Sequence, residues 1–136
     1  MMRCVSLLRI LVVDDDSLLL CALQQVLELE GHLVHIADGG QAGIDAFSAT
    51  QQGRDASSFD VVITDLGMPQ VDGRTVAAAV KALAPATPVI LLTGRGCRLQ
   101  SDDDVPQHVD RVLSKPPKLH ELRTALADLR RGGSVA

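Results

Sequence analysis

The chain alternates between short, purely apolar runs and longer stretches in which apolar residues recur every three or four positions. Uninterrupted apolar runs are typical of strands buried on both faces of a sheet, and the longer spacing is typical of amphipathic helices. The apolar runs predict strands at residues 9–13, 32–36, 61–63, 89–92 and 111–113. The helical spacing predicts helices at residues 17–30, 41–50, 75–83 and from 119 onward.

Capping and turn residues agree with these boundaries. Asp16 or Ser17 can cap the first helix, and Gly31 is a stop signal at its end. The polar segment 51–58 predicts a loop, and Gly132 with Gly133 predicts the start of a loose tail. The apolar face of the first helix is predicted from Leu19, Leu23, Val26 and Leu27.

Strands that alternate with helices predict a doubly wound α/β domain with a parallel sheet and helices on both faces. Its flavodoxin-like form has five strands in the order 2-1-3-4-5. A crossover is needed between Thr93 and Asp110, but glycines, Pro106 and an aspartate run there predict a short or irregular fourth helix around Arg98. The length of 136 residues predicts one domain over 1–136, with a core at about 9–130 and a tail at 131–136.

Composition excludes several classes of function. A formal charge of −4 argues against a nucleic-acid partner, and two phenylalanines without Trp or Tyr argue against base stacking. Three widely spaced cysteines suit a reduced, cytoplasmic protein better than a disulfide scaffold or zinc site. The first apolar run is broken by Arg9, so neither a signal peptide nor a membrane span is expected.

Acidic residues follow two of the predicted strands. Asp14 and Asp15 end the first strand, and Asp65 ends the third, which lies beside the first in the order 2-1-3-4-5. Three such carboxylates would repel one another, and a bound cation would relieve that repulsion. An oxygen-only set suits Mg²⁺, with Mn²⁺ as a substitute, and a backbone carbonyl near Gly67 would complete the shell.

The remaining strand ends supply a hydroxyl and a positive charge. Thr93 follows the fourth strand and Lys115 follows the fifth. A metal, a hydroxyl and an ammonium around Asp65 would stabilise the charge of a transferred phosphoryl group. Asp65 is therefore the candidate nucleophile, and an aspartyl phosphate is the expected product.

These residues together resemble the receiver domain of bacterial response regulators, the family that includes the chemotaxis regulator. The resemblance covers about residues 9–130. It rests on the acidic pair after Leu11-Val12-Val13, the segment Asp65-Leu66-Gly67-Met68-Pro69 with Asp72-Gly73, Thr93-Gly94 and Lys115-Pro116.

The resemblance implies a two-component phosphoacceptor that catalyses its own phosphorylation and dephosphorylation. Asp65 would take the phosphoryl group from a histidine kinase or a histidine phosphotransfer protein, and a conformational switch would follow. Asp15 would bind Mg²⁺ directly, Asp14 would support it, and the Lys115–Pro116 bond would be cis. A monomer or weak dimer, without nucleic-acid or membrane partners, is expected.

The chain also departs from the family pattern. Val112 stands where the family usually has an aromatic residue that couples to Thr93, which puts the usual aromatic switch in question. Gly67 and Arg95 occupy the variable positions beside the phosphorylation site, and Gly67 has no side chain to orient water. Residues 93–119 look similar to receivers at the C-terminal end of hybrid sensor kinases, and no output domain is expected after residue 118.

Other functions were weighed against the receiver. Asp14 and Asp16 fit the start of a haloacid-dehalogenase-type phosphatase, but residues 102–104 precede Lys115, whereas that family places its second acidic pair after the lysine. A pseudo-receiver would keep the fold as a binding module without the chemistry. His120 resembles a kinase phosphoacceptor, although an amphipathic helix explains its segment.

Overall fold

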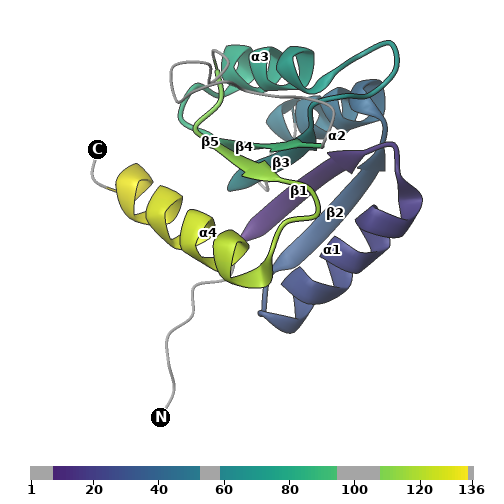
Figure 1. Cartoon of the computed structure of the whole chain (residues 1–136). Coiled ribbons are helices and arrows are strands. Elements are labelled where there is room, and N and C mark those ends of the chain that lie inside the picture. Colours follow the sequence, from purple (N-terminus) through teal and green to yellow (C-terminus); the bar gives the residue numbers. More distant parts are fainter. Residues whose placement is uncertain (1–7, 53–58, 95–107, 135–136) are drawn as a thin grey trace.

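The computed structural model describes residues 8–52, 59–94 and 108–134 and shows a parallel sheet with helices packed against both faces (Figure 1). In these ranges no helix is long and apolar enough to cross a membrane. The strands are β1 (Arg9–Asp14), β2 (Leu33–Asp38), β3 (Val61–Asp65), β4 (Val89–Thr93) and β5 (Arg111–Ser114). The helices are α1 (Ser17–Leu29), α2 (Gly40–Gln52), α3 (Gly73–Leu83) and α4 (Leu119–Ser134).

The sheet has the strand order β2-β1-β3-β4-β5, and all its pairs are parallel. This confirms the predicted flavodoxin-like arrangement, in which the first and third strands are neighbours. Val13 is in register with Thr64, and Asp65 is in register with Leu92. The C-terminal ends of the strands, which carry the candidate site residues, therefore lie side by side at one end of the sheet.

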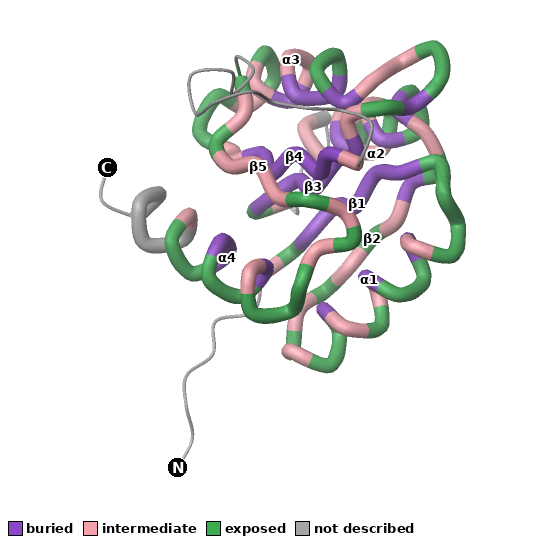
Figure 2. The backbone as a smooth tube through the Cα atoms, viewed as in Figure 1, coloured by how far each residue is buried: buried purple, intermediate pink, exposed green. Residues whose placement is uncertain are grey.

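Two apolar layers form the core, one on each face of the sheet, because side chains alternate along every strand. Both layers appear as buried segments in Figure 2. In one layer α1 and α4 cover the sheet, with Ile10, Val12, Leu23, Leu27, Ile63 and Leu122 among its members. In the other layer α2 and α3 cover it, with Leu11, Val13, Phe47, Val62, Val76 and Val80 among its members.

Both ends of α1 are capped by the residues that the sequence indicated. The Asp16 side chain accepts hydrogen bonds from the backbone N–H groups of Leu18 and Leu19. At the other end Gly31 has a φ of 98°, and His32 donates its N–H to the Leu27 carbonyl, the pattern of a Schellman motif. The chain can then reverse at once into β2.

The buried face of α1 differs by one position from the prediction. Leu20, Leu23 and Leu27 are buried, whereas Leu19 and Val26 are only half-buried. Leu19 still packs against the same core layer as Leu23 and Leu27, so the predicted face is largely correct, and Leu20 is the buried residue that it omitted. Periodicity locates an apolar stripe to within about one residue, and the packing of α1 against the sheet selects its centre.

Helix α4 is longer than the sequence indicated. It continues through Gly132 and Gly133 to Ser134, so the loose tail predicted from residue 131 is wrong up to that point. Leu122, Ala125 and Leu126 anchor this helix in the core. Once a helix has formed, each residue added at its end gains one hydrogen bond without the cost of nucleation. The final turn consequently tolerates glycines, although each costs about 1 kcal/mol relative to alanine.

Two predicted segments fall partly or wholly beyond the described ranges. Helix α2 extends to Gln52, two residues into the predicted loop, and residues 53–58 lie outside the described part. The irregular helix expected around Arg98 also lies outside it, as does the aspartate run at 102–104.

Candidate functional site

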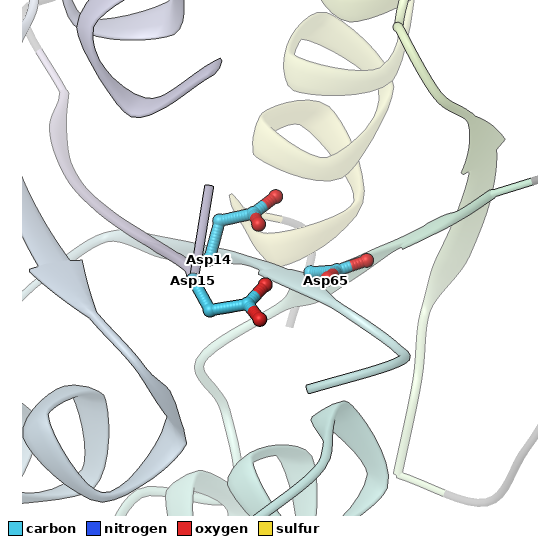
Figure 3. A group of neighbouring side chains, drawn as sticks. All are labelled: Asp14, Asp15 and Asp65. Carbon is cyan, nitrogen blue, oxygen red and sulfur yellow. The ribbon is translucent and has the colours of Figure 1, made fainter. Parts of the chain in front are cut away.

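Three acidic side chains converge where β1 and β3 end. Asp14 is the last residue of β1, Asp15 follows it, and Asp65 is the last residue of β3. One carboxylate oxygen from each residue lies within 4.8 Å of the others (Figure 3). Asp14 and Asp65 are buried, while Asp15 is exposed. The group therefore faces solvent on one side and the core on the other.

Lys115 supplies the positive charge of this site. Its Nζ lies 3.2 Å from Asp14 Oδ2 and 3.2 Å from Asp65 Oδ1. The backbone places it there, because the Lys115 N–H donates to the Thr93 carbonyl at 2.8 Å, just beyond the paired residues Thr93 and Ser114. The Lys115–Pro116 peptide bond is cis, as the family resemblance implied.

Thr93 and Gly67 lie at the rim of the same site. Thr93 ends β4 one residue beyond Leu92, the register partner of Asp65, and its side chain is largely buried. Gly67 is exposed in the loop that follows β3. A Cβ added to Gly67 would meet no atom of the described residues within 4 Å.

The site carries more negative charge than its lysine balances. Burial raises the pKa of Asp14, and the charge of Asp65 adds to this, whereas the Asp16 N–H and Lys115 oppose it. Burial acts to lower the pKa of Lys115, but the Asp14 and Asp65 carboxylates outweigh it, so the pKa is raised above its usual value. Lys115 therefore remains protonated at neutral pH.

The donor set fits a hard divalent cation. Asp14 Oδ2 is fully buried and accepts no hydrogen bond from the described residues, and its ion pair with Lys115 is only partial compensation. Three carboxylates with an exposed member suit Mg²⁺, which keeps several of its waters. Asp14, Asp15 and Asp65 are the residues that would hold it.

Replacing Lys115 with alanine is expected to make stability depend on a divalent cation. The change leaves two buried carboxylates without their ammonium, which should cost about 1–2 kcal/mol, less than for a fully buried pair because Lys115 is 21% exposed. Thermal melts with EDTA and with Mg²⁺ would measure this. We expect Mg²⁺ to raise the Tm of the variant more than that of the wild type, and equal shifts would contradict this prediction.

The other predicted candidates lie outside the acidic group. The Asp16 side chain caps α1, so it does not stand beside Asp14 as the dehalogenase-type arrangement requires. His120 is exposed in the first turn of α4. Of the other histidines, His35 and His108 are exposed, whereas His32 is half-buried and accepts a hydrogen bond from the Leu8 N–H.

Three glycines provide close contacts around the site that the sequence pattern did not reveal. A Cβ on Gly73 would collide with the Asp65 carbonyl and lie 2.9 Å from Leu66 Cα. A Cβ on Gly43 would lie 2.6 Å from a Val13 methyl group, next to Asp14, and one on Gly40 would collide with the Val71 carbonyl. The sequence showed the pair Asp72-Gly73 as part of the family resemblance, but it gave no sign of this close contact.

The loop after β3 has a fixed conformation. Met68 is buried in the core layer beneath α2 and α3. Gln70 has a φ of 68°, and the Val71 N–H donates to the Pro69 carbonyl at 2.7 Å, which makes a γ-turn. Asp72 then caps α3 by accepting from the Thr75 N–H. Before Gly67 the Leu66 N–H donates to the Leu92 carbonyl at 2.9 Å, so the chain is held on both sides of Gly67.

Comparison with known proteins identifies the family. The family described as "Response regulator receiver domain" matches residues 10–127, nearly the whole chain. The chain belongs to the response regulator receiver family. It is accordingly a receiver domain of two-component signalling, a family in which phosphorylation and Mg²⁺ binding are general.

Curated relatives of this receiver are named as transcriptional regulators. It is 33% identical over 131 residues to the transcriptional regulatory protein TcrA of Mycobacterium tuberculosis, with 96% of this chain and 49% of the relative covered. It is 38% identical over 130 residues to the transcriptional regulatory protein PrrA of Mycobacterium bovis, with 94% and 52% covered. The chain thus spans about half the length of these relatives.

Solved structures agree with the receiver fold. A response regulator receiver domain from Clostridium thermocellum superposes with a TM-score of 0.81 at 29% identity, with 95% of this chain and 99% of that one covered. The response regulator TrrA of Thermotoga maritima, in complex with Mg²⁺ and BeF, superposes with a TM-score of 0.74 at 28% identity, with 89% and 97% covered.

Within the receiver, Val112 occupies the position at which the family resemblance leads us to expect an aromatic residue. Val112 lies in β5 in register with Leu91 and is half-buried. The aromatic residues Phe47 and Phe59 belong to the opposite part of the sheet, where their rings stack 6.2 Å apart. Neither ring can therefore take the place of an aromatic at position 112.

Proposed function

We propose that Asp65 is the residue that accepts the phosphoryl group, from a phosphohistidine of a histidine kinase or histidine phosphotransfer protein. The observation that carries this is the environment of Asp65, a buried carboxylate that is paired with Lys115 and has an oxygen within 4.8 Å of oxygens of Asp14 and Asp15. It occupies a rigid strand end, whereas Asp15 is exposed and Asp14 lies deeper in the core.

In the proposed reaction an oxygen of Asp65 forms a bond to phosphorus. The P–N bond to the donor imidazole breaks, and its electron pair returns to the imidazole nitrogen. The Lys115 ammonium, already 3.2 Å from Asp65, interacts with the oxygens of the transferred group. The Thr93 hydroxyl is the second donor to these oxygens, because Thr93 ends the neighbouring strand.

Mg²⁺ is the proposed cofactor, with Mn²⁺ as a substitute. When bound, it neutralises negative charge on the carboxylates and on the phosphoryl oxygens. Asp14, Asp15, Asp65 and the backbone carbonyl of Gly67 are the proposed ligands. The support for this set is the group of three converging carboxylates and the buried Asp14 oxygen without a hydrogen bond from the described residues.

The proposed switch operates through Lys115 and Thr93. Lys115 is shared between Asp14 and Asp65 before phosphorylation. A phosphoryl group adds about two negative charges at Asp65, which draws both Lys115 and Thr93 toward it. Since Val112 offers no aromatic ring, movement of the loops after β4 and β5 would itself carry the signal.

A kinase or phosphotransfer protein is the proposed partner, and residues 9–130 are the proposed receiver core. Relatives such as PrrA are named as transcriptional regulators and extend beyond the region that matches this chain. A DNA target would therefore belong to a longer protein of that kind. The alternative context, a receiver joined to a hybrid sensor kinase, rests on the sequence of residues 93–119 alone.

Incubation with acetyl phosphate and Mg²⁺ is the test of the proposed function. Intact mass is expected to show one phosphoryl adduct on the wild-type chain and none when EDTA replaces Mg²⁺. The requirement for a cation follows from the uncompensated carboxylates around Asp65. Absence of any adduct under all conditions would reject the phosphoacceptor function and favour a binding module that keeps only the fold.

The phosphorylated chain is expected to lose its phosphoryl group slowly. Gly67 has no side chain to orient an attacking water, and a Cβ at this position would meet no atom of the described residues within 4 Å. Gly67→Asn should shorten the phosphoryl half-life several-fold, because its amide can hold a water near the phosphorus. Gly67→Ala is the matched control, since it adds a Cβ without an amide. A wild-type half-life of seconds, unchanged by Gly67→Asn, would contradict this prediction.

A further inference from the structure

Strand β2 forms one edge of the sheet, and its outer side is unpaired in the part of the chain that the structure describes. It pairs only with β1, and the Leu33 N–H donates to the Leu8 carbonyl. Because alternate residues of a parallel strand bond to the same neighbour, the backbone groups of Val34 and Ile36 point away from β1. These groups are free to pair with another strand.

The two edge strands of the sheet, β2 and β5, differ in how well they are protected against pairing with a strand of another chain. Strand β5 has four residues, begins with Arg111 and is followed directly by Lys115. Strand β2 has six residues and contains no lysine, arginine, proline or glycine, the residues that commonly block an edge. Its Leu33 is 47% exposed. Beside it lies an open hollow of about 400 Å³, lined by Leu33, Val34, His35 and Phe59 among others.

The sequence of this edge is complementary to itself. We propose that two copies of this chain associate through their β2 strands, paired antiparallel with His35 of one copy opposite His35 of the other. In this register Leu33 stands opposite Ala37 and Val34 stands opposite Ile36 of the second copy. At each end His32 stands opposite Asp38, so the Asp38 carboxylate meets a polar side chain and not an apolar one.

The neighbouring registers fit less well. In one neighbouring register Ile36 stands opposite Ile36 of the second copy. Asp38 then stands opposite Val34, which puts a carboxylate against an apolar side chain. In the other neighbouring register Val34 stands opposite Val34 of the second copy. His32 then stands opposite Ile36, and Asp38 has no partner on the other strand. The register centred on His35 also lets Val34 and Ile36 exchange backbone hydrogen bonds with the second copy.

The expected product is a weak, two-fold symmetric dimer with one continuous sheet. Two strands of six residues bury less area than the roughly 1,200 Å² of a stable interface, so association should appear only at high concentration. Sedimentation equilibrium of the full chain up to about 1 mM is the measurement. This proposal is independent of the chemistry at Asp65. Asp65 ends β3, and β1 separates β3 from β2 in the sheet.

The matched variants are His35→Glu and Leu29→Glu, because both change an exposed residue to glutamate. His35→Glu brings two carboxylates face to face in the dimer and should weaken association about tenfold or more. Leu29 is 86% exposed at the end of α1 and takes no part in the proposed strand pairing, so Leu29→Glu should leave association unchanged. Equal effects of the two variants, or a wild-type chain that stays monomeric, would overturn the proposal.

Disulfide trapping tests the register itself. In a chain with Cys4, Cys21 and Cys97 replaced by serine, His35→Cys should form a cross-linked dimer on mild oxidation, because non-hydrogen-bonded partners lie only about 4.5 Å apart. Leu33→Cys in the same background should not, since its two copies would be roughly 13 Å apart along the strands. Cross-linking at residue 33 but not at 35 would overturn this pairing.

Discussion

Replacing Asp65 with asparagine is expected to abolish phosphoryl labelling and to leave the fold intact. The side chains are nearly equal in size, and Asp65 is only 4% exposed, so the amide fits the same space. An amide oxygen is a poor nucleophile, and the variant also removes one of three carboxylates at the cation site. Both effects reduce phosphoryl labelling.

Intact mass after treatment with acetyl phosphate and Mg²⁺ measures this effect, and Asp14→Asn is the companion variant. The wild type should carry one adduct and Asp65→Asn none, while circular dichroism and a cooperative melt should show that the variant is folded. Since Asp14 is proposed to hold Mg²⁺, Asp14→Asn should slow labelling and leave Asp65 as the acceptor. Labelling that persists in Asp65→Asn and is lost only in Asp14→Asn would place the acceptor on Asp14.

Gly73→Ala is expected to destabilise the chain and to slow the labelling of Asp65. The added methyl group would collide with the Asp65 carbonyl and lie 2.8 Å from a Leu91 methyl group, so α3 must move away from the end of β3. Overpacking of this kind costs about 1–3 kcal/mol. The Gly73 N–H also donates to the Leu66 carbonyl at 2.9 Å, and the shift would weaken that bond.

Gly94→Ala is the matched control, because its added methyl group meets no atom of the described residues within 4 Å. Urea unfolding should give a lower midpoint for Gly73→Ala than for the wild type, and almost no change for Gly94→Ala. The initial rate of acetyl phosphate labelling should fall in Gly73→Ala when both proteins are folded. A Gly73→Ala chain with wild-type stability and rate would show that α3 and β3 are not tightly coupled.

The order of chemical groups along the chain determined where the site would form. Apolar runs without polar residues indicated buried parallel strands, and such strands place their carboxyl ends at one edge of the sheet. Asp14 follows one of these runs directly, and Asp65 and Lys115 each follow another after a single residue. Their meeting could therefore be predicted from these patterns together with the flavodoxin-like strand order, and the distances of 3.2 Å from Lys115 to both carboxylates agree with it.

Only the tertiary structure decided the contacts between segments that are distant in sequence. The approach of Gly73 to the Asp65 carbonyl depends on how closely α3 packs, and no local pattern encodes that distance. The buried face of α1 is centred on Leu20 and Leu23 because the helix settles against the sheet in one orientation. The free outer side of β2 likewise depends on strand order, which long-range pairing determines.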